Sequence, residues 1–208
     1  VPDGLVVLHH GRGSDEHDLI GLADILDPAR RLHFTSARGP LTIAGWPGRH
    51  WYVVRQVGFP DAESFHAATS SLGELHDRLW RETGVGPERT VLGGFSMGSV
   101  MSFATGLGPG RPATAGILGI SGFIPTVEGW AADFTGRPGT KVLVAHGRND
   151  EVIPFGFAEQ AREATARGGL QVSALDSDGG HAIDGSWVLP MRDWLNETLP
   201  PIESDPAG

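Results

Sequence analysis

The sequence predicts an α/β fold in which a mostly parallel central sheet carries helices on both faces. Short, nearly continuous apolar runs alternate along the chain with longer amphipathic segments. Parallel strands are buried on both faces and read as uninterrupted apolar runs, whereas the covering helices show an apolar stripe. The length of 208 residues suits one domain, which can bury about 70% of its unfolded surface in one core.

Seven segments have the length and composition of strands. They are rich in β-branched or continuous apolar residues and are bounded by turn residues. In chain order they are 4–10, 31–36, 51–54, 89–95, 114–121, 141–147 and 170–175. In a sheet of this type the loops at the carboxyl ends of the strands carry the functional site.

Amphipathic segments between the strands predict the helices 64–84, 96–108, 154–169 and 186–199. The first of them places Leu72, Leu75 and Leu79 on one face and ends at Gly84, a typical C-terminal glycine. Pro190 must lie in the first turn of the last helix or kink it. We expect residues 1–199 to form a single domain and the proline-rich, acidic residues 200–208 to form a flexible tail.

The net charge of −9 argues against nucleic acid or an anionic membrane as the main partner. No apolar stretch approaches the ~18 residues that a membrane span requires, and the first residues lack the basic region of a signal peptide. The absence of cysteine excludes disulfides, thiolate metal sites and a cysteine nucleophile. It also fits a cytoplasmic protein, which is the location that we expect.

A glycine-flanked serine, Ser96, stands where the strand 89–95 gives way to the helix 96–108, within the sequence LGGFSMG. The pattern G-x-S-x-G is expected by chance roughly 0.3 times in a chain so rich in glycine. The pattern alone therefore does not identify a nucleophile, and its position in the fold has to be considered. Gly94 and Gly98 allow the strand and the helix to approach closely, and the helix start offers free N–H groups. This setting is typical of a serine nucleophile on a tight turn.

A serine nucleophile requires a base that is oriented by a third group. Asp150 follows the strand 141–147, and His181 lies in the loop between the last strand and the last helix. The order Ser, Asp, His is the one that hydrolases of this fold use. We therefore predict a Ser96–His181–Asp150 triad. Asp176 and Asp178 also precede His181, but we expect them to be solvated turn residues.

The first strand runs into His10, Gly11, Arg12 and Gly13. A backbone N–H in this loop, that of Arg12, could join that of Met97 to bind a developing oxyanion. This role needs only the backbone. We expect the side chains of His9 and His10 to be buried and hydrogen-bonded to backbone groups.

Six segments, LHHGRGSDEHDL, ARGP, GGFSMGS, ISGF, HGRNDEVIP and GGH, resemble the phospholipase/carboxylesterase family of α/β-hydrolases in order and spacing. That family includes small bacterial carboxylesterases and the acyl-protein thioesterases, and the resemblance extends from about residue 4 to residue 196. It implies a compact α/β-hydrolase fold without a large lid domain.

The resemblance also implies site roles that agree with those derived above. Ser96 would be the nucleophile, Asp150 the acid and His181 the base, with the N–H groups of Arg12 and Met97 forming the oxyanion hole. Met97 stands where many relatives carry glutamine. Because the donor is the backbone, we expect catalysis to survive this difference and the polarity near the acyl carbon to change.

Other residues have plainer interpretations. His17 lies among Asp15, Glu16 and Asp18, but adjacent residues on one helical turn point in different directions, which favours a solvated helix entry over a metal site. His146 is expected to brace the loop that carries Asp150. No metal and no cofactor are implied.

Trp46, Trp51 and Phe123 are candidates for lining an acyl pocket, although large aromatic residues more often belong to the core.

The predicted function is that of a serine carboxylesterase, which hydrolyses small carboxylic esters through an acyl-enzyme. The alternative is a lysophospholipase or acyl-protein thioesterase that acts on long acyl chains. A third reading, a catalytically silent binding module, is disfavoured because no triad position is missing. We expect a small-molecule ester as partner and a monomer or homodimer.

Overall fold

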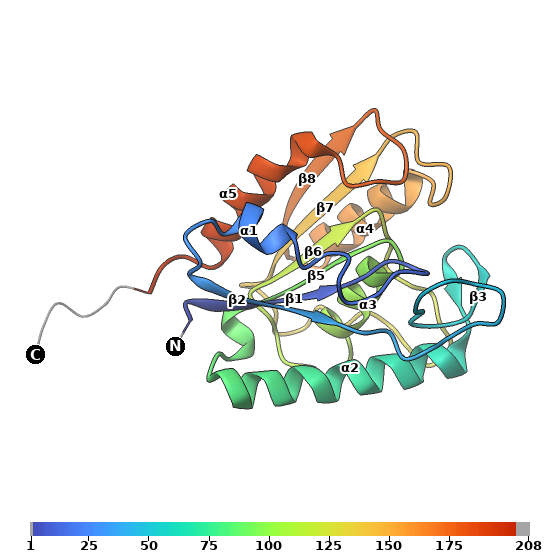
Figure 1. Cartoon of the computed structure of the whole chain (residues 1–208), viewed down its shortest axis with the longest axis horizontal. Coiled ribbons are helices and arrows are strands. Elements are labelled where there is room, and N and C mark those ends of the chain that lie inside the picture. The colour runs from blue at the N-terminus through green and yellow to red at the C-terminus, as the bar shows by residue number, and fades with distance from the viewer. Residues whose placement is uncertain (1, 203–208) are drawn as a thin grey trace, which may run out of the picture.

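A six-stranded sheet forms the centre of the protein in the computed structural model, which describes residues 2–202 (Figure 1). The strand order is β2-β1-β5-β6-β7-β8, and every neighbouring pair is parallel. The strands are β1 Gly4–His9, β2 Leu32–Ala37, β5 Thr90–Phe95, β6 Gly116–Ile120, β7 Lys141–Gly147 and β8 Gln171–Ser177. The prediction of a mostly parallel sheet is confirmed.

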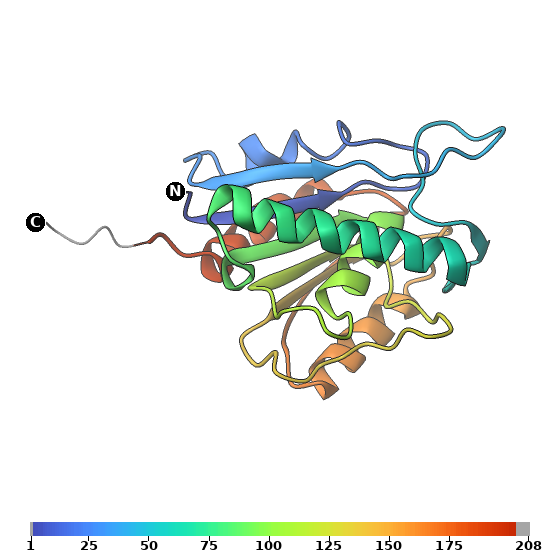
Figure 2. The same ribbon diagram turned by 90° about the horizontal axis from the view of Figure 1, so that it is seen from below.

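Helices cover both faces of this sheet. They are α1 Leu22–Leu26, α2 Ala62–Thr83, α3 Met97–Gly106, α4 Gly156–Arg167 and α5 Val188–Thr198, with short 3₁₀ turns η1 Pro87–Arg89 and η2 Gly185–Trp187. Helices α1 and α5 lie against each other on one face, and α2, α3 and α4 cover the other (Figures 1 and 2).

The alternation of side chains along each strand explains the two layers. Along β7, Leu143 packs in the same apolar cluster as α5, whereas its neighbours Val142 and Val144 pack with α3 and α4. Successive side chains of a strand point to opposite faces, so a strand that is apolar throughout must be covered on both. The continuous apolar runs in the sequence therefore reflect apolar packing on both faces of the sheet.

Helix ends follow local sequence signals. The Asp61 carboxylate caps α2 by accepting a hydrogen bond from the Ser64 N–H, so this helix starts two residues before the predicted position. It ends at Gly84, whose φ of 70° is left-handed, as the sequence indicates. Pro190 lies in the first turn of α5, where its missing N–H costs no helical hydrogen bond.

The predicted strand 51–54 is wrong. Residues 51–53 form an irregular segment, and the nearby strand β3 Val54–Gln56 pairs only with β4 Phe59–Pro60 in a separate antiparallel hairpin. The aromatic pair Trp51 and Tyr52 is buried by packing beneath this loop and not by strand pairing. An apolar run of strand length cannot distinguish these two causes of burial.

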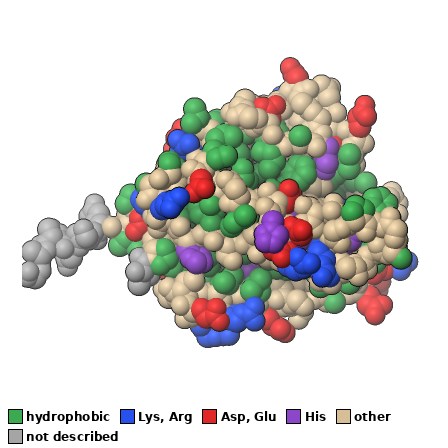
Figure 3. All heavy atoms as spheres, in the orientation of Figure 1, with side chains coloured by type: hydrophobic (Ala, Val, Ile, Leu, Met, Phe, Trp, Pro, Cys, Tyr) green, Lys and Arg blue, Asp and Glu red, His purple; other side chains and the backbone are tan. Residues whose placement is uncertain are grey.

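Acidic and basic side chains are interspersed over the face in Figure 3, and no basic patch extends across it. None of the helices in residues 2–202 has the length and the apolar composition that crossing a bilayer requires. The predicted tail, 200–208, lies outside the described residues from 203 onward.

Candidate active site

Ser96 lies on a strained turn between β5 and α3. Its φ of 56° is left-handed, which is uncommon for a residue with a side chain. The Ser96 N–H donates to the carbonyl of Ile120 on the neighbouring strand, at 2.9 Å, and fixes the turn. An added Cβ at Gly98 would overlap the carbonyl oxygen of His9, and one at Gly94 would overlap the backbone of Gly98. Both glycines of the motif are therefore needed for the close approach of strand and helix.

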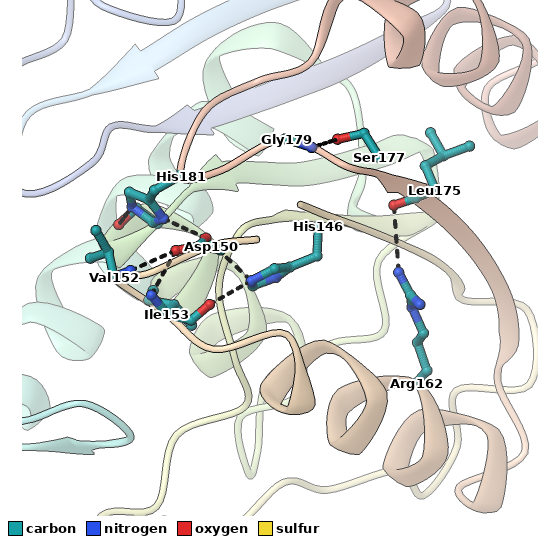
Figure 4. Close-up of polar contacts among 10 residues, drawn as sticks. His146, Asp150, Val152, Ile153, Arg162, Leu175, Ser177, Gly179 and His181 are labelled. Carbon is teal, nitrogen blue, oxygen red and sulfur yellow. Dashed lines mark hydrogen bonds and ion pairs between the residues drawn. The ribbon is translucent and has the colours of Figure 1, made fainter. Parts of the chain in front are cut away.

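The structure brings together the three side chains of the predicted triad. His181 Nε2 lies 2.8 Å from Ser96 Oγ, and His181 Nδ1 lies 2.7 Å from Asp150 Oδ2. Figure 4 shows the His181 imidazole and the Asp150 carboxylate directed toward one another from the loops that follow β8 and β7. A carboxylate on Nδ1 places the proton there and leaves Nε2 to accept from the serine hydroxyl.

Asp150 is held as a carboxylate by three hydrogen bonds. Its Oδ1 accepts from the N–H groups of Val152 and Ile153, each at 2.8 Å, and its Oδ2 faces His181. Burial raises the pKa of Asp150, but the hydrogen bonds from His181, Ile153 and Val152 outweigh it, and the net pKa is lowered. The Asp150 carboxylate is therefore charged at neutral pH and can stabilise a positive charge on the His181 imidazole.

His146 lies on the other side of the Asp150 carboxylate (Figure 4). Its Nε2 lies 2.8 Å from the Ile153 carbonyl oxygen and 3.3 Å from Asp150 Oδ2. Burial lowers the pKa of His146, so the ring is neutral and carries its proton on Nε2 toward these two oxygens. The ring thus contacts both ends of the loop 150–153, consistent with the expected bracing role.

Neither alternative aspartate contacts His181 by a hydrogen bond in the described structure. Asp176 lies in β8 and not in a turn, and its carboxylate pairs with Arg148 and Arg162, at 2.6 Å each. The backbone carbonyl of Asp178 accepts a hydrogen bond from the Asn149 side chain. The sequence interpretation of Asp176 as a solvated turn residue is therefore corrected to a paired strand residue.

Two backbone N–H groups near Ser96 have no protein acceptor within residues 2–202. One is that of Met97, the first residue of α3, and the other is that of Arg12, just after β1. The register pairs His9 with Gly94, so both chain segments emerge from the same edge of the sheet. Free donors at this edge are suited to an anionic oxygen.

A cavity of about 70 Å³ opens beside Ser96. Its walls are mostly apolar and include Phe123, as the sequence indicates. The residues that line it are Arg12, Tyr52, Val54, Gln56, Val57, Ser96, Met97, Phe123, Val152 and Ile153. Val152 and Ile153 lie two and three residues after the predicted acid in the segment DEVIP, and this proximity in sequence could have identified them as lining residues.

Trp46 and Trp51 do not line this cavity, which corrects the sequence interpretation. Trp51 is only 1% exposed and lies behind the site, where its indole N–H donates to the His10 carbonyl at 2.9 Å. Trp46 is 52% exposed and stacks against the guanidinium of Arg12. Trp51 therefore supports the backbone of the loop after β1, and Trp46 packs against the side chain of Arg12 on that loop.

The paired histidines at the end of β1, His9 and His10, are buried, but only His10 bonds to backbone groups as expected. His10 Nδ1–H donates to the Gly11 carbonyl, and its Nε2 accepts from the Gly39 N–H. His9 instead contacts two side chains, Ser102 at 2.8 Å and His76 at 3.4 Å.

His17 is exposed in a turn before α1, and not in a helix. Its N–H bonds to the Asp15 carboxylate, while Glu16 pairs with Arg38. Within residues 2–202 no group of three or more His, Asp or Glu side chains is arranged to hold a metal ion.

This fold, with a serine on the turn between β5 and α3, defines the class of the α/β-hydrolases. The family model described as Phospholipase/Carboxylesterase matches residues 2–199, and the chain belongs to that family. The chain is a carboxylic ester hydrolase.

Individual relatives agree with this assignment. The chain is 28% identical to acyl-protein thioesterase 1 of Yarrowia lipolytica over 169 residues, which cover 76% of this chain and 74% of that protein. It is 26% identical to esterase YpfH of Escherichia coli, over 98% of this chain and 86% of the relative. Among solved structures, esterase PE8 has 29% identity and a TM-score of 0.79, covering 96% of this chain and 94% of its own. A Bacillus cereus carboxylesterase shares the fold, with a TM-score of 0.81 at 24% identity over 94% of this chain and 88% of its own.

Proposed function

We propose that the protein is a serine carboxylesterase that hydrolyses small carboxylic esters through an acyl-enzyme. The observation that carries this proposal is the continuous path of hydrogen bonds from Ser96 Oγ through His181 to Asp150, with lengths of 2.8 and 2.7 Å. Distances of this size allow proton transfer in the transition state.

The proposed reaction begins when Ser96 Oγ attacks the ester carbonyl carbon and His181 Nε2 takes the hydroxyl proton. Asp150 stabilises the resulting imidazolium, and the N–H groups of Arg12 and Met97 bind the oxyanion. Collapse of the tetrahedral intermediate breaks the C–O bond, and the alcohol leaves with the proton from His181. Water then attacks the acyl-enzyme while His181 takes its proton. The bond between the acyl carbon and Ser96 Oγ breaks, His181 returns the proton to Ser96, and the carboxylic acid is released.

The size of the cavity supports small esters. At about 70 Å³ it is well below the roughly 300–1,000 Å³ that is typical of sites for drug-sized ligands, so a short acyl group fits it better than a long one. Residues 121–140, between β6 and β7, contain no helix that could act as a lid over a long acyl chain.

A second candidate, hydrolysis of long-chain acyl thioesters or lysophospholipids, is favoured by the acyl-protein thioesterases among the relatives. Rates on 4-nitrophenyl esters from acetyl to palmitoyl, and on matched thioesters, distinguish the two. A maximum between acetyl and butyryl supports the first proposal, and a maximum at dodecanoyl or longer supports the second.

Replacement of the proposed nucleophile tests the mechanism. We expect Ser96→Ala to lower kcat on 4-nitrophenyl butyrate by about 10⁴-fold or more. Ser71→Ala, an exposed serine on α2, provides the matched control and should retain the wild-type rate. A fluorophosphonate probe should label the wild type and the control but not Ser96→Ala. Unlabelled wild-type protein would instead support the silent binding module.

The cytoplasmic location is also a proposal, supported by the cysteine-free sequence. Cell fractionation tests the location, and analytical ultracentrifugation distinguishes the proposed monomer from the homodimer.

A further inference from the structure

The side chain of Arg12 lies at the mouth of the cavity beside Ser96. Arg12 follows β1, and its guanidinium carbon lies 3.8 Å from the centre of the Trp46 ring. Arg12 is also part of the cavity lining. Stacking on an indole restricts the positions of a long side chain and leaves the edge of the guanidinium free to donate hydrogen bonds.

The charge of Arg12 has no partner within residues 2–202, where the guanidinium makes neither an ion pair nor a hydrogen bond. The acidic residues on the same loop, Asp15, Glu16 and Asp18, form no ion pair with Arg12 in the described part of the chain. Glu16 pairs with Arg38, and Asp15 accepts the N–H of His17. In a protein with a net charge of −9, an unpaired cation at the site is therefore available to a ligand.

The remainder of the cavity wall offers little to a charged ligand. Arg12 is the one charged residue among the described residues that line it. The polar groups besides Ser96 are those of Tyr52 and Gln56, and the other lining side chains are apolar. An anionic group that enters this cavity has a single counter-charge to which it can bind.

We propose that Arg12 is a specificity-determining residue that binds a carboxylate carried by the substrate. The preferred substrates would be monoanionic esters, such as the half-esters of short dicarboxylic acids, with the scissile carbonyl at Ser96. A guanidinium matches a carboxylate with two parallel N–H···O hydrogen bonds. This inference rests on the proposed esterase function and specifies that the preferred substrate carries a negative charge.

The test compares two esters of equal acyl length, 4-nitrophenyl pentanoate and the mono-4-nitrophenyl ester of glutaric acid. The second differs from the first by a terminal carboxylate. The rate of Ser96→Ala is subtracted from each measurement, which removes spontaneous hydrolysis of the half-ester. The measured quantity is the ratio of kcat/KM for the anionic ester to kcat/KM for the neutral one.

We expect Arg12→Gln to lower this ratio about tenfold, mainly through KM on the anionic ester, because one charge-assisted contact is lost. Arg12→Lys keeps the charge without the paired donors and should recover part of the ratio. In the wild type the ratio should fall as salt is added, since a contact at an exposed rim is screened. Both substitutions keep the backbone N–H of residue 12.

Arg78→Gln is the matched control, because it removes the same charge from an exposed position on α2. The control should leave the ratio at its wild-type value. An unchanged ratio in Arg12→Gln, or an equal fall in Arg78→Gln, would overturn the inference while leaving the esterase proposal intact. Failure of the wild type to exceed Ser96→Ala on either ester would instead overturn the esterase proposal itself.

Discussion

The backbone of Ser96 has a left-handed φ of 56° that persists because its surroundings fix it. The N–H is bonded to Ile120 on one side, and the backbone of α3 begins on the other. Positive φ is costly for a residue with a side chain and is concentrated at functional sites. At this residue the conformation places the hydroxyl within hydrogen-bond distance of His181.

Asp150→Asn should lower kcat on 4-nitrophenyl butyrate by about 10⁴-fold, because an amide can donate to the imidazole and favour the wrong tautomer. The low pKa of Asp150 means that the wild-type side chain is charged throughout the assay range. Steady-state kinetics of the purified variant provide the measurement. Asp176→Asn, which removes a nearby carboxylate that has no contact with His181, is the control. Equal rates for Asp150→Asn and the wild type would mean that another group orients the histidine.

The three predicted triad residues could be found from the sequence because each lies in the loop or turn that follows its own strand, where the fold places functional side chains. The cavity wall could not be found in the same way. Tyr52 and Val57 reach it from a loop and hairpin whose path depends on contacts distant in sequence, including the bond from the Trp51 N–H to the Met97 sulfur.

At the scale of elements, the sequence predicts the buried strands well and the irregular segments poorly. The strand 141–147 was predicted with its observed bounds, because both of its faces are covered and its apolar run is unbroken. The segment 51–54 was mistaken for a strand because burial beneath a loop leaves the same apolar signature. The five-residue helix α1 was not predicted, since it is too short to show a helical period.

The close contact between β1 and α3 predicts that substitution by alanine affects stability very differently at two glycines, Gly98 and Gly156. Gly98→Ala should lower the free energy of unfolding by about 1–3 kcal/mol, because its Cβ would overlap the backbone of His9 and the sheet cannot easily yield. Esterase activity should fall with it, since α3 begins directly after Ser96. Urea denaturation measures the first effect.

Gly156→Ala is the control for this prediction. Gly156 is the first residue of α4, and an added Cβ there meets no atom within 4 Å. Alanine in a helix restricts the unfolded chain, so this variant should be neutral or more stable by about 0.4–1 kcal/mol. A similar loss of stability in both variants would show that the close approach at Gly98 is unimportant.

At the scale of the whole molecule, a buried polar chain ties the sheet to two helices. His76 on α2 lies 3.4 Å from His9 on β1, and His9 lies 2.8 Å from the Ser102 hydroxyl on α3. The Ser102 hydroxyl donates onward to the carbonyl of Gly98. For both histidines, burial is the largest cause of a lowered pKa, with His9 well below its usual value and His76 at about 3. Both rings are therefore neutral in the folded protein.

We propose that residues 1–199 form a single domain, so unfolding should occur in one transition whose free energy depends on pH. In the unfolded chain both histidines bind a proton near pH 6.5, and the folded chain does not. The free energy of unfolding should therefore fall as the pH is lowered below 6.5, by about 1.4 kcal/mol per pH unit for each histidine. Urea denaturation between pH 7.5 and 5, followed by circular dichroism and tryptophan fluorescence, measures both effects.

His76→Gln should reduce this pH dependence, because it removes one of the rings whose pKa is lowered by burial while keeping a hydrogen-bonding side chain. If the free energy of unfolding of His76→Gln depended on pH as steeply as that of the wild type, the prediction for the histidines would be contradicted. If circular dichroism and tryptophan fluorescence gave different unfolding transitions, the single domain would be contradicted.

The hairpin β3–β4 stands apart from the six-stranded sheet, yet its strands and the turn between them supply Val54, Gln56 and Val57 to the cavity. Ser96, Asp150 and His181 are anchored instead to strand ends deep in the scaffold. Part of the cavity wall thus resides on a module separate from the proposed reacting groups, and exchanging residues 54–60 among relatives offers a way to change which substrates are accepted while leaving the triad in place.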